Sequence, residues 1–298
     1  MGDRPVLLVG ADGQVGRAFV RHGEAWSGRL VALGHRDLDI RDGARVRDAV
    51  KRLNPEVVIN AAAYTAVDAA ERDVGLAFAV NRDGVGHLAA ACADASIPLI
   101  HVSTDYVFDG EKGEPYLETD PVHPLGVYGA SKLAGEDLLR SRLEEHVILR
   151  TAWVFSPDRT NFVKTILRLA SERPELRVVA DQRGGPTSAD AIARALVAIT
   201  ERILASPTGW GTYHFCGAPA VSWWDFASAI VDVAAPRIGR RVPIAAITTA
   251  DYPTPARRPK NSVLSCARIA AVFGLAQPDW REALPRVVGT ILDEGARA

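Results

Sequence analysis

A tyrosine and a lysine four positions apart, Tyr128 and Lys132, are the residues of this sequence best suited to proton transfer. Small and apolar residues follow at helical spacing, so the two side chains should share one face of a helix. A phenol normally loses its proton near pH 10. An ammonium about 4 Å away stabilises a phenolate by roughly 4 kcal/mol at an effective dielectric of about 20, or about three pKa units. The pair therefore predicts a proton donor that works near neutral pH.

Hydroxyl groups lie upstream of this pair. An apolar run over residues 98–102 predicts a strand, and Ser103, Thr104 and Asp105 follow at its end. A hydroxyl, a tyrosine and a lysine in this chain order can hold a carbonyl group and protonate it. The spacing alone is as consistent with chance as with a site, so the interpretation depends on the N-terminal sequence.

The N-terminal sequence has a glycine-rich turn between a short apolar run and a helical segment. Gly10 permits a tight turn, Gly13 lets backbone N–H groups approach a pyrophosphate, and Gly16 lets the helix pack closely on the strand. A glycine pattern alone is weak evidence. Its position after a strand and before a helix is the context that supports it. The turn predicts dinucleotide binding.

The segment after the second apolar run bears on the choice of cofactor. An NAD site usually has an acidic residue at the end of this strand, about 20 residues beyond the glycines, to bind the ribose hydroxyls. Here Gly34 stands at that point, with Arg36 close by. This favours NADPH, with NADH use left open. The alternative is that Arg36 simply faces solvent.

Strands and helices alternate through the first half of the chain. This pattern predicts an α/β fold with a doubly wound parallel sheet of the Rossmann type. After about residue 155 the alternation loosens, which predicts a smaller α/β lobe for the substrate. We therefore expect a dinucleotide-binding domain over residues 1–155 and a mainly substrate-binding lobe over residues 156–298, with some elements returning to the first sheet. The ranges expected as strands are 5–9, 30–33, 57–59, 98–102, 146–150, 177–180, 212–215 and 244–247, and those expected as helices are 46–53, 77–95, 162–172, 189–205, 223–234 and 281–292.

Composition excludes several classes of function. The 298 residues carry a net charge of −1 with no Lys/Arg block, which argues against a nucleic-acid partner. Three widely spaced cysteines indicate a reducing compartment and neither a disulfide framework nor a zinc site. No signal peptide and no membrane-length apolar run are found. We expect a cytoplasmic protein without a membrane partner.

The motifs together resemble a known family. The chain is similar to the extended short-chain dehydrogenases/reductases, and more narrowly to the dTDP-4-dehydrorhamnose reductases, which complete the synthesis of dTDP-L-rhamnose for cell-surface polysaccharides. The resemblance covers essentially the whole chain. The motifs that carry it are GADGQVG (10–16), NAAAYTAVDAAE (60–71), VSTDYVFDG (102–110), PLGVYGASKLAGE (124–136), RTAWVF (150–155), DQRGGPT (181–187) and YPTPARRPKNSVL (252–264).

The resemblance implies residue roles in catalysis and substrate binding. Tyr128 would donate the proton, Lys132 would assist it and hold the cofactor ribose, and Thr104 would tune the carbonyl. Asp105, Tyr106 and Trp153 would contact the deoxysugar nucleotide together with Thr104 and Tyr128. For Trp153, packing in the core is the alternative.

The resemblance also implies a cofactor site, which Tyr128 and Lys132 would complete. Its other residues would lie along the pyrophosphate, the adenine and the ribose: Gly10, Gly13, Gln14, Val15, Gly16, Arg36, Asp39, Ile40, Ala61, Ala62, Ala63 and Thr65. Some family members are dimers bridged by magnesium, with one carboxylate just after the glycine motif. Because Ala18 stands there, we predict no metal ligands, and a homodimer and its magnesium stay open.

The implied activity is NAD(P)H-dependent reduction of the C4 keto group of dTDP-4-dehydro-L-rhamnose. Reduction of another dTDP-4-dehydro-6-deoxysugar, such as a dihydrostreptose-type sugar of antibiotic synthesis, is an alternative that a few pocket residues could decide. Epimerisation of a sugar nucleotide is disfavoured by the specific motifs. A non-catalytic role, like that of the regulatory subunit of methionine adenosyltransferase, is disfavoured because Thr104, Tyr128 and Lys132 are all present.

Overall fold

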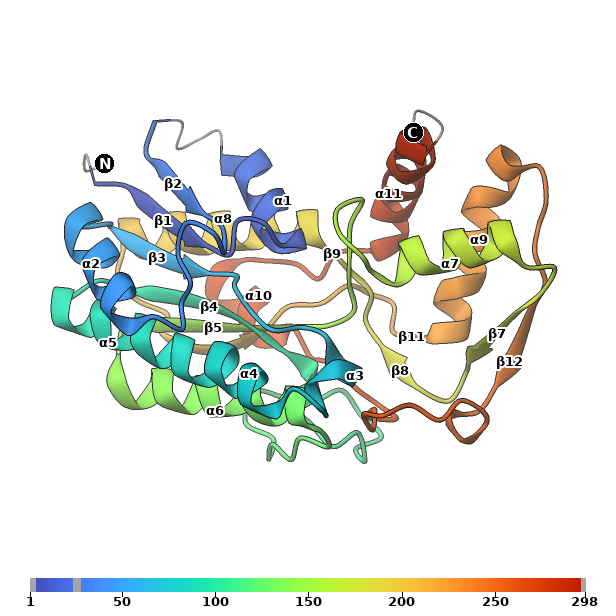
Figure 1. Cartoon of the computed structure of the whole chain (residues 1–298), viewed down its shortest axis with the longest axis horizontal. Coiled ribbons are helices and arrows are strands. Elements are labelled where there is room, and N and C mark those ends of the chain that lie inside the picture. Colours follow the sequence, from blue (N-terminus) through green and yellow to red (C-terminus); the bar gives the residue numbers. More distant parts are fainter. Residues whose placement is uncertain (1–3, 24–27, 296–298) are drawn as a thin grey trace.

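A six-stranded parallel sheet forms the centre of the molecule. The computed structural model describes residues 4–23 and 28–295. The strands lie in the order β10-β5-β4-β3-β1-β2, and every neighbouring pair is parallel (Figure 1). The prediction of a doubly wound parallel sheet is confirmed. The strands are β1 (Val6–Val9), β2 (Leu30–Leu33), β3 (Val57–Asn60), β4 (Leu99–Thr104), β5 (His146–Thr151) and β10 (Gly211–His214).

Helices cover both faces of this sheet because its strands are apolar on both sides. On one face, α1 (Gln14–His22), α8 (Ala189–Ala205) and α10 (Ala267–Phe273) close a core around Phe19 and Leu196. On the other, α2 (Gly43–Leu53), α5 (Val85–Ala95) and α6 (Val127–Arg142) close a core around Leu88 and Leu139. Thus three elements late in the chain return to the first sheet: β10 is its edge strand, and α8 and α10 pack against its face.

A separate hydrophobic core holds together the part of the chain drawn at the right of Figure 1. It is built around Phe155, Phe226 and Trp280. Its elements are β6 (Val154–Phe155), α7 (Phe162–Glu172), β7 (Leu176–Val179), α9 (Trp223–Ile238), β12 (Ile244–Ile247) and α11 (Trp280–Gly295), and nearby lie β8 (Arg183–Gly184), β9 (Thr187–Ser188), β11 (Val221–Ser222) and the 3₁₀ turn Thr249–Asp251. No helix within residues 4–23 and 28–295 is long and apolar enough to cross a membrane.

The alanine-rich segment expected as one helix over residues 77–95 contains a change of helix type. It runs from α4 (Val74–Phe78) through a π-helical turn (Ala79–Gly84) into α5, and α3 (Val67–Ala70) precedes it. Asn81 lies in the π turn, fully buried. Single π turns within α-helices often occur at functional sites, and this one faces α6.

The sequence missed the shortest elements. The strands β6, β8, β9 and β11 have two residues each, too few to show an alternating pattern. The helix α10 was also missed, because three nearby prolines suggested an irregular segment. The longer elements with a clear periodic pattern were predicted more accurately.

A buried ion pair joins α6 to β5 beneath the strand ends. Glu136 is fully buried and accepts bonds from Arg150 at 2.7 and 3.0 Å and from Arg140 at 2.6 Å. These arginines hold the pKa of Glu136 below its ordinary value of 4.5, although burial works against them. Removing one partner of such a pair strands a buried charge, which is far more costly than breaking a surface pair.

We predict that Glu136→Gln lowers the free energy of unfolding by about 3–5 kcal/mol, measured by urea denaturation at pH 7. The matched control is Asp137→Asn, the next residue on the helix, whose exposed pair with Arg140 should contribute no more than about 0.5 kcal/mol. Because the folded pKa of Glu136 is depressed, its stabilisation is present above pH 4.5 and is lost as the pH falls through the folded value. The deficit of Glu136→Gln should therefore shrink in acid; equal losses in the two variants would contradict the assignment.

Candidate active site

A cleft of about 590 Å³ opens at the carboxyl ends of the sheet strands, where ligands bind in folds of this class. Side chains and backbone from β4, α6, the glycine-rich turn and the segment after β5 form its wall. Twelve residues expected from the sequence line it: Gly13, Gln14, Val15, Ala61, Ala63, Thr65, Thr104, Asp105, Tyr106, Tyr128, Lys132 and Trp153. We call it the larger cleft.

Tyr128 enters the larger cleft from the first turn of α6. The half-buried ring lies edge-on to Tyr106, with the two ring centroids 5.8 Å apart. Burial, with a smaller contribution from the Asp105 charge, raises the pKa of Tyr128 to about 12, although a hydrogen bond with Thr104 opposes the change. Tyr128 is therefore a protonated phenol at neutral pH, the form that can donate.

Lys132 lies one turn along the same helix, and only 2% of its surface is exposed. Its Nζ donates to Val102 O at 2.7 Å and lies 3.3 Å from His101 Nε2. Burial lowers the pKa of Lys132 to about 8, while Glu136 opposes the change. The expectation that Lys132 lowers the pKa of Tyr128 is wrong for this structure: removal from water dominates both groups and favours their neutral forms.

Thr104 and Asp105 occupy the turn at the end of β4. The Thr104 hydroxyl donates to Asp105 Oδ1 at 3.1 Å and accepts from the Tyr106 N–H at 3.2 Å, which fixes its position at the start of the 3₁₀ turn Asp105–Val107. Burial raises the pKa of Asp105 to about 7, against hydrogen bonds with Ser262 and Thr104 that lower it. The two side chains present a hydroxyl and a weakly acidic carboxyl beside Tyr128.

Trp153 forms an aromatic wall of the larger cleft. Its ring stacks on Trp223 with centroids 3.4 Å apart and an interplanar angle of 4°. Its φ of 47° lies in the left-handed region, which is costly for a bulky side chain and is typical of functional sites. The structure thus places Trp153 both against the core and on the cleft surface.

A smaller cleft of about 370 Å³ lies on the other side of the glycine-rich turn. It shares Gly13, Ala61 and Ala63 with the larger cleft, so the two form a continuous band. Asp39 lies in its wall, and hydrogen bonds from the side chain and backbone N–H of Arg41 hold the pKa of that carboxyl at about 2. The expected residues in its wall are Gly10, Gly13, Asp39, Ile40, Ala61, Ala62 and Ala63.

Two expected residues line neither cleft. Gly16 instead sets the helix–turn packing, because a Cβ there would lie 2.2 Å from Gly10 O. Arg36 is exposed, and its side chain has no hydrogen bond or ion pair to any residue that the structure describes. His35 and Arg41 line the smaller cleft in its place.

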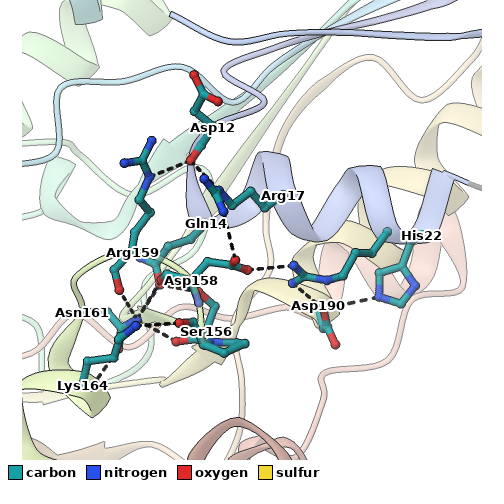
Figure 2. Close-up of polar contacts among 12 residues, drawn as sticks. Asp12, Gln14, Arg17, His22, Ser156, Asp158, Arg159, Asn161, Lys164 and Asp190 are labelled. Atoms are coloured by element: carbon teal, nitrogen blue, oxygen red, sulfur yellow. Dashed lines mark hydrogen bonds and ion pairs between the residues drawn. The ribbon is translucent and has the colours of Figure 1, made fainter. Parts of the chain in front are cut away.

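The glycine-rich turn is joined to the loop at residues 156–161, as Figure 2 shows. Gln14 Oε1 accepts from Ser156 Oγ at 2.8 Å and from Asn161 Nδ2 at 3.0 Å. Arg159, with a left-handed φ of 56°, donates to Asp12 O at 2.8 Å. Both hydrogen bonds to Gln14 Oε1 therefore come from this loop, and only the side-chain amide N–H groups of Gln14 remain to contact a ligand.

Several residues at the site were not expected from the sequence. Arg159, Asn161 and Trp223 line the larger cleft from the later part of the chain, where no motif marked them. The Asn81 side chain accepts from the Tyr64 N–H at 2.8 Å and donates to Tyr64 O at 3.0 Å. Asn60 was also missed, although it ends β3, and His101, inside β4, carries no signal in the sequence. Within the described residues, no three His, Cys, Asp or Glu side chains gather as a metal site would require.

Comparison with known proteins agrees with this geometry. Residues 4–292 match the family described as the RmlD substrate binding domain. A dTDP-4-dehydrorhamnose reductase of Aggregatibacter actinomycetemcomitans is 48% identical over 287 residues, which cover 95% of this chain and 97% of the relative.

Two solved structures are also similar. The dTDP-4-dehydrorhamnose reductase of Clostridium acetobutylicum has a TM-score of 0.90 and 36% identity, covering 97% of this chain and 99% of that one. The enzyme of the same name from Bacillus anthracis, solved in complex with NADP, has a TM-score of 0.87 and 32% identity, covering 96% and 99%. Sequence and structure agree over nearly the full length, and the chain belongs to the dTDP-4-dehydrorhamnose reductase family.

Proposed function

We propose that this protein reduces the C4 keto group of dTDP-4-dehydro-L-rhamnose with NADPH, and with NADH as a further donor. The observation that carries the proposal is the joining of Thr104, Tyr128 and Lys132 in one cleft that continues to the glycine-rich turn. Relatives of 48% identity bear the name of this activity, and a similar structure contains NADP.

The residues at the glycine-rich turn fit a dinucleotide. Gly13 is the N-cap of α1; no side chain caps this helix, and no acidic residue lies in its first turn. The backbone N–H groups of the first turn of α1 are therefore available to a pyrophosphate, which the helix dipole also favours. Gly10, at φ +85°, approaches Ala62 so closely that a Cβ would lie 2.3 Å from its nitrogen, so only glycine lets the turn pack against the loop after β3.

NADPH would supply the hydride, and the chain supplies orientation and the proton. Tyr128 donates its phenolic proton to the oxygen at C4 as that oxygen gains negative charge. The Thr104 hydroxyl lies beside the Tyr128 phenol, and by turning its one proton away from Asp105 it would donate to the same oxygen. Lys132, directed by Val102 O, would hold the cofactor ribose. Asp105, Tyr106 and Trp153 would position the deoxysugar nucleotide, whose remote groups supply binding energy for orientation.

The proposal also assigns cofactor binding and substrate binding to different parts of the chain. Residues 1–155 would bind the cofactor, and residues 156–298 would mainly bind the substrate. The separate core around Phe226 supports this division, and the packing of α8 and β10 on the first sheet supports the exception. A homodimer remains a prediction.

We predict that Tyr128→Phe lowers kcat by about 10² to 10⁴-fold, because the variant keeps the ring and loses only the positioned proton. The measurement is NADPH oxidation with dTDP-4-dehydro-L-rhamnose, and KM should change far less than kcat. The matched control is Tyr213→Phe in β10, which loses a single hydrogen bond to Gly209 O and should keep its activity. Nearly full activity in Tyr128→Phe would move the proton donor to Thr104 or to water.

We predict that Gly13→Val abolishes NADPH binding without unfolding the protein. The backbone at Gly13, φ −75° and ψ 171°, suits any residue, and the nearest atom to a new Cβ is 3.4 Å away. The branched side chain would instead enter the two clefts that Gly13 lines. Fluorescence titration with NADPH and thermal unfolding test both halves of this prediction. Gly113→Val, at an exposed position with no neighbour within 4 Å, is the control; equal NADPH affinity in the two variants would refute the site.

We predict that NADPH is used at least as well as NADH, and that Arg36→Ala lowers kcat/KM for NADPH by about tenfold while leaving that for NADH unchanged. An unpaired guanidinium can turn toward a 2′-phosphate, and a hydrogen bond to a charged group contributes about 1.5–3 kcal/mol before exposure reduces it. Arg47→Ala, exposed on α2, is the control. A strong preference for NADH in the unaltered protein would leave Arg36 a solvent-facing residue.

A further inference from the structure

Two buried polar side chains that the proposed reaction does not use lie beside Lys132. The register of β3 and β4 pairs Asn60 with His101, and neither has any exposed surface. His101 Nδ1 lies 3.1 Å from Asn60 Nδ2, and His101 Nε2 lies 3.3 Å from Lys132 Nζ. A neutral imidazole has one donor and one acceptor, so its proton must face one of these two nitrogens.

The backbone decides which way the Asn60 amide points. The Ala62 N–H lies 3.0 Å from Asn60 Oδ1. Because a backbone N–H can only donate, the side-chain atom that faces it must be the amide oxygen and not the nitrogen. Asn60 Nδ2 is therefore directed at His101 and donates to Nδ1. A neutral His101 must then carry its proton on Nε2, toward Lys132.

His101 is neutral at physiological pH. Burial, followed by repulsion from Lys132, holds the pKa of His101 well below its ordinary value. Its Nε2–H thus faces Lys132 Nζ at hydrogen-bond distance. An ammonium has three donors and no acceptor, so it has no good contact with this N–H. A neutral amine has a lone pair that can accept it.

We propose that His101 is a positioning residue: fixed by Asn60 in the tautomer protonated on Nε2, it donates to Lys132 Nζ and stabilises the neutral amine over the ammonium. The bond from Lys132 to Val102 O can be made by either form, so it directs Nζ without choosing between them. The inference rests on the proposed place of Lys132 in the active site. It concerns a charge state, however, which can be measured without substrate or cofactor.

The other charged groups around Lys132 do not strongly favour either its ammonium or its neutral amine. Glu136, on the same helix, favours the ammonium, but its oxygens are already bound by Arg140 and by Arg150 of β5. The titratable and charged groups in this neighbourhood are Tyr128, Glu136 and Arg140 of α6, His101 of β4, Asp105 of the turn after β4, and His146 and Arg150 of β5.

The first test reads the tautomer directly in the full-length protein without ligands. The sequence has seven histidines, so ¹⁵N NMR of histidine-labelled protein can resolve their ring nitrogens, with His101→Gln to assign the signals of residue 101. We expect a protonated Nε2 and an unprotonated Nδ1 at pH 7. A proton on Nδ1, or on both nitrogens, would overturn the proposal, and this measurement on the unaltered protein requires no variant to fold.

The second test follows the charge of Lys132. The sequence has five lysines, so ¹³Cε signals can be titrated individually and assigned with Lys132→Met. In His101→Gln the amide oxygen can accept from an ammonium, and we expect the pKa of Lys132 to rise by about one unit or more. The matched control is His146→Gln, a buried histidine of the next strand whose ring bonds Leu143 O, which should leave Lys132 within about 0.3 units. The same pKa in both variants would refute the role of His101.

A third variant keeps the test decisive if His101→Gln does not fold. In Asn60→Asp, one carboxylate oxygen can accept from the Ala62 N–H and the other from a proton on His101 Nδ1. We expect the histidine proton to move to Nδ1; its retention on Nε2 would contradict the tautomer lock. Failure of the proposed function would appear separately, as absent NADPH oxidation in an unaltered protein whose His101 and Lys132 titrate as expected.

Discussion

The site depends on how closely α6 approaches the backbone of its neighbours. A Cβ at Gly129 would lie 2.1 Å from Tyr106 O, and one at Gly135 would lie 2.0 Å from Asn81 O. No side chain fits at either distance, so the helix is in direct contact with backbone on both sides of Lys132. This contact sets the depth of the helix, and the depth lets Lys132 Nζ reach Val102 O. The position of the two central side chains is thus fixed by backbone packing and not by the side chains themselves.

A chain of hydrogen bonds connects α6 to the loop after β3, which lines the proposed cofactor cleft. Asn81, in the π turn, binds both backbone groups of Tyr64 and donates to Ser131 Oγ at 2.9 Å. Ser131 in turn donates to Tyr128 O at 2.8 Å. The loop after β3, which lines both clefts, is therefore tied to the helix that carries Tyr128. Because Asn81 and Ser131 are fully buried and every member is paired, this network should hold one geometry rather than several.

Much of this arrangement could be predicted from sequence, and the rest could not for identifiable reasons. The strand Leu30–Leu33 and the helix Ala189–Ala205 were expected at their observed bounds, because apolar runs and helical periodicity are local signals. The grouping of Thr104, Tyr128 and Lys132 followed from chain order in a parallel sheet. The pKa of Tyr128 was misjudged, because the loss of solvent around a phenol depends on packing that no local pattern shows. His101 looked like an ordinary strand residue for the same reason: its partner Asn60 is 41 positions away.

The pKa values of Tyr128 and Lys132 are set mainly by their removal from water and not by one nearby charge. Burial opposes an isolated charge on either Tyr128 or Lys132: it keeps the phenol protonated and lowers the pKa of Lys132 to about 8, so that the neutral amine becomes accessible slightly above neutral pH. An alkoxide is a stronger base than a phenolate, and proton transfer from Tyr128 to a new alkoxide is therefore downhill even when burial has raised the phenol pKa. The phenolate left behind favours an ammonium on Lys132, with the additional proton taken from water. Phenol with amine, and phenolate with ammonium, both have no net charge. A low-dielectric site can pass between these two states at less cost than it could hold a permanent ammonium.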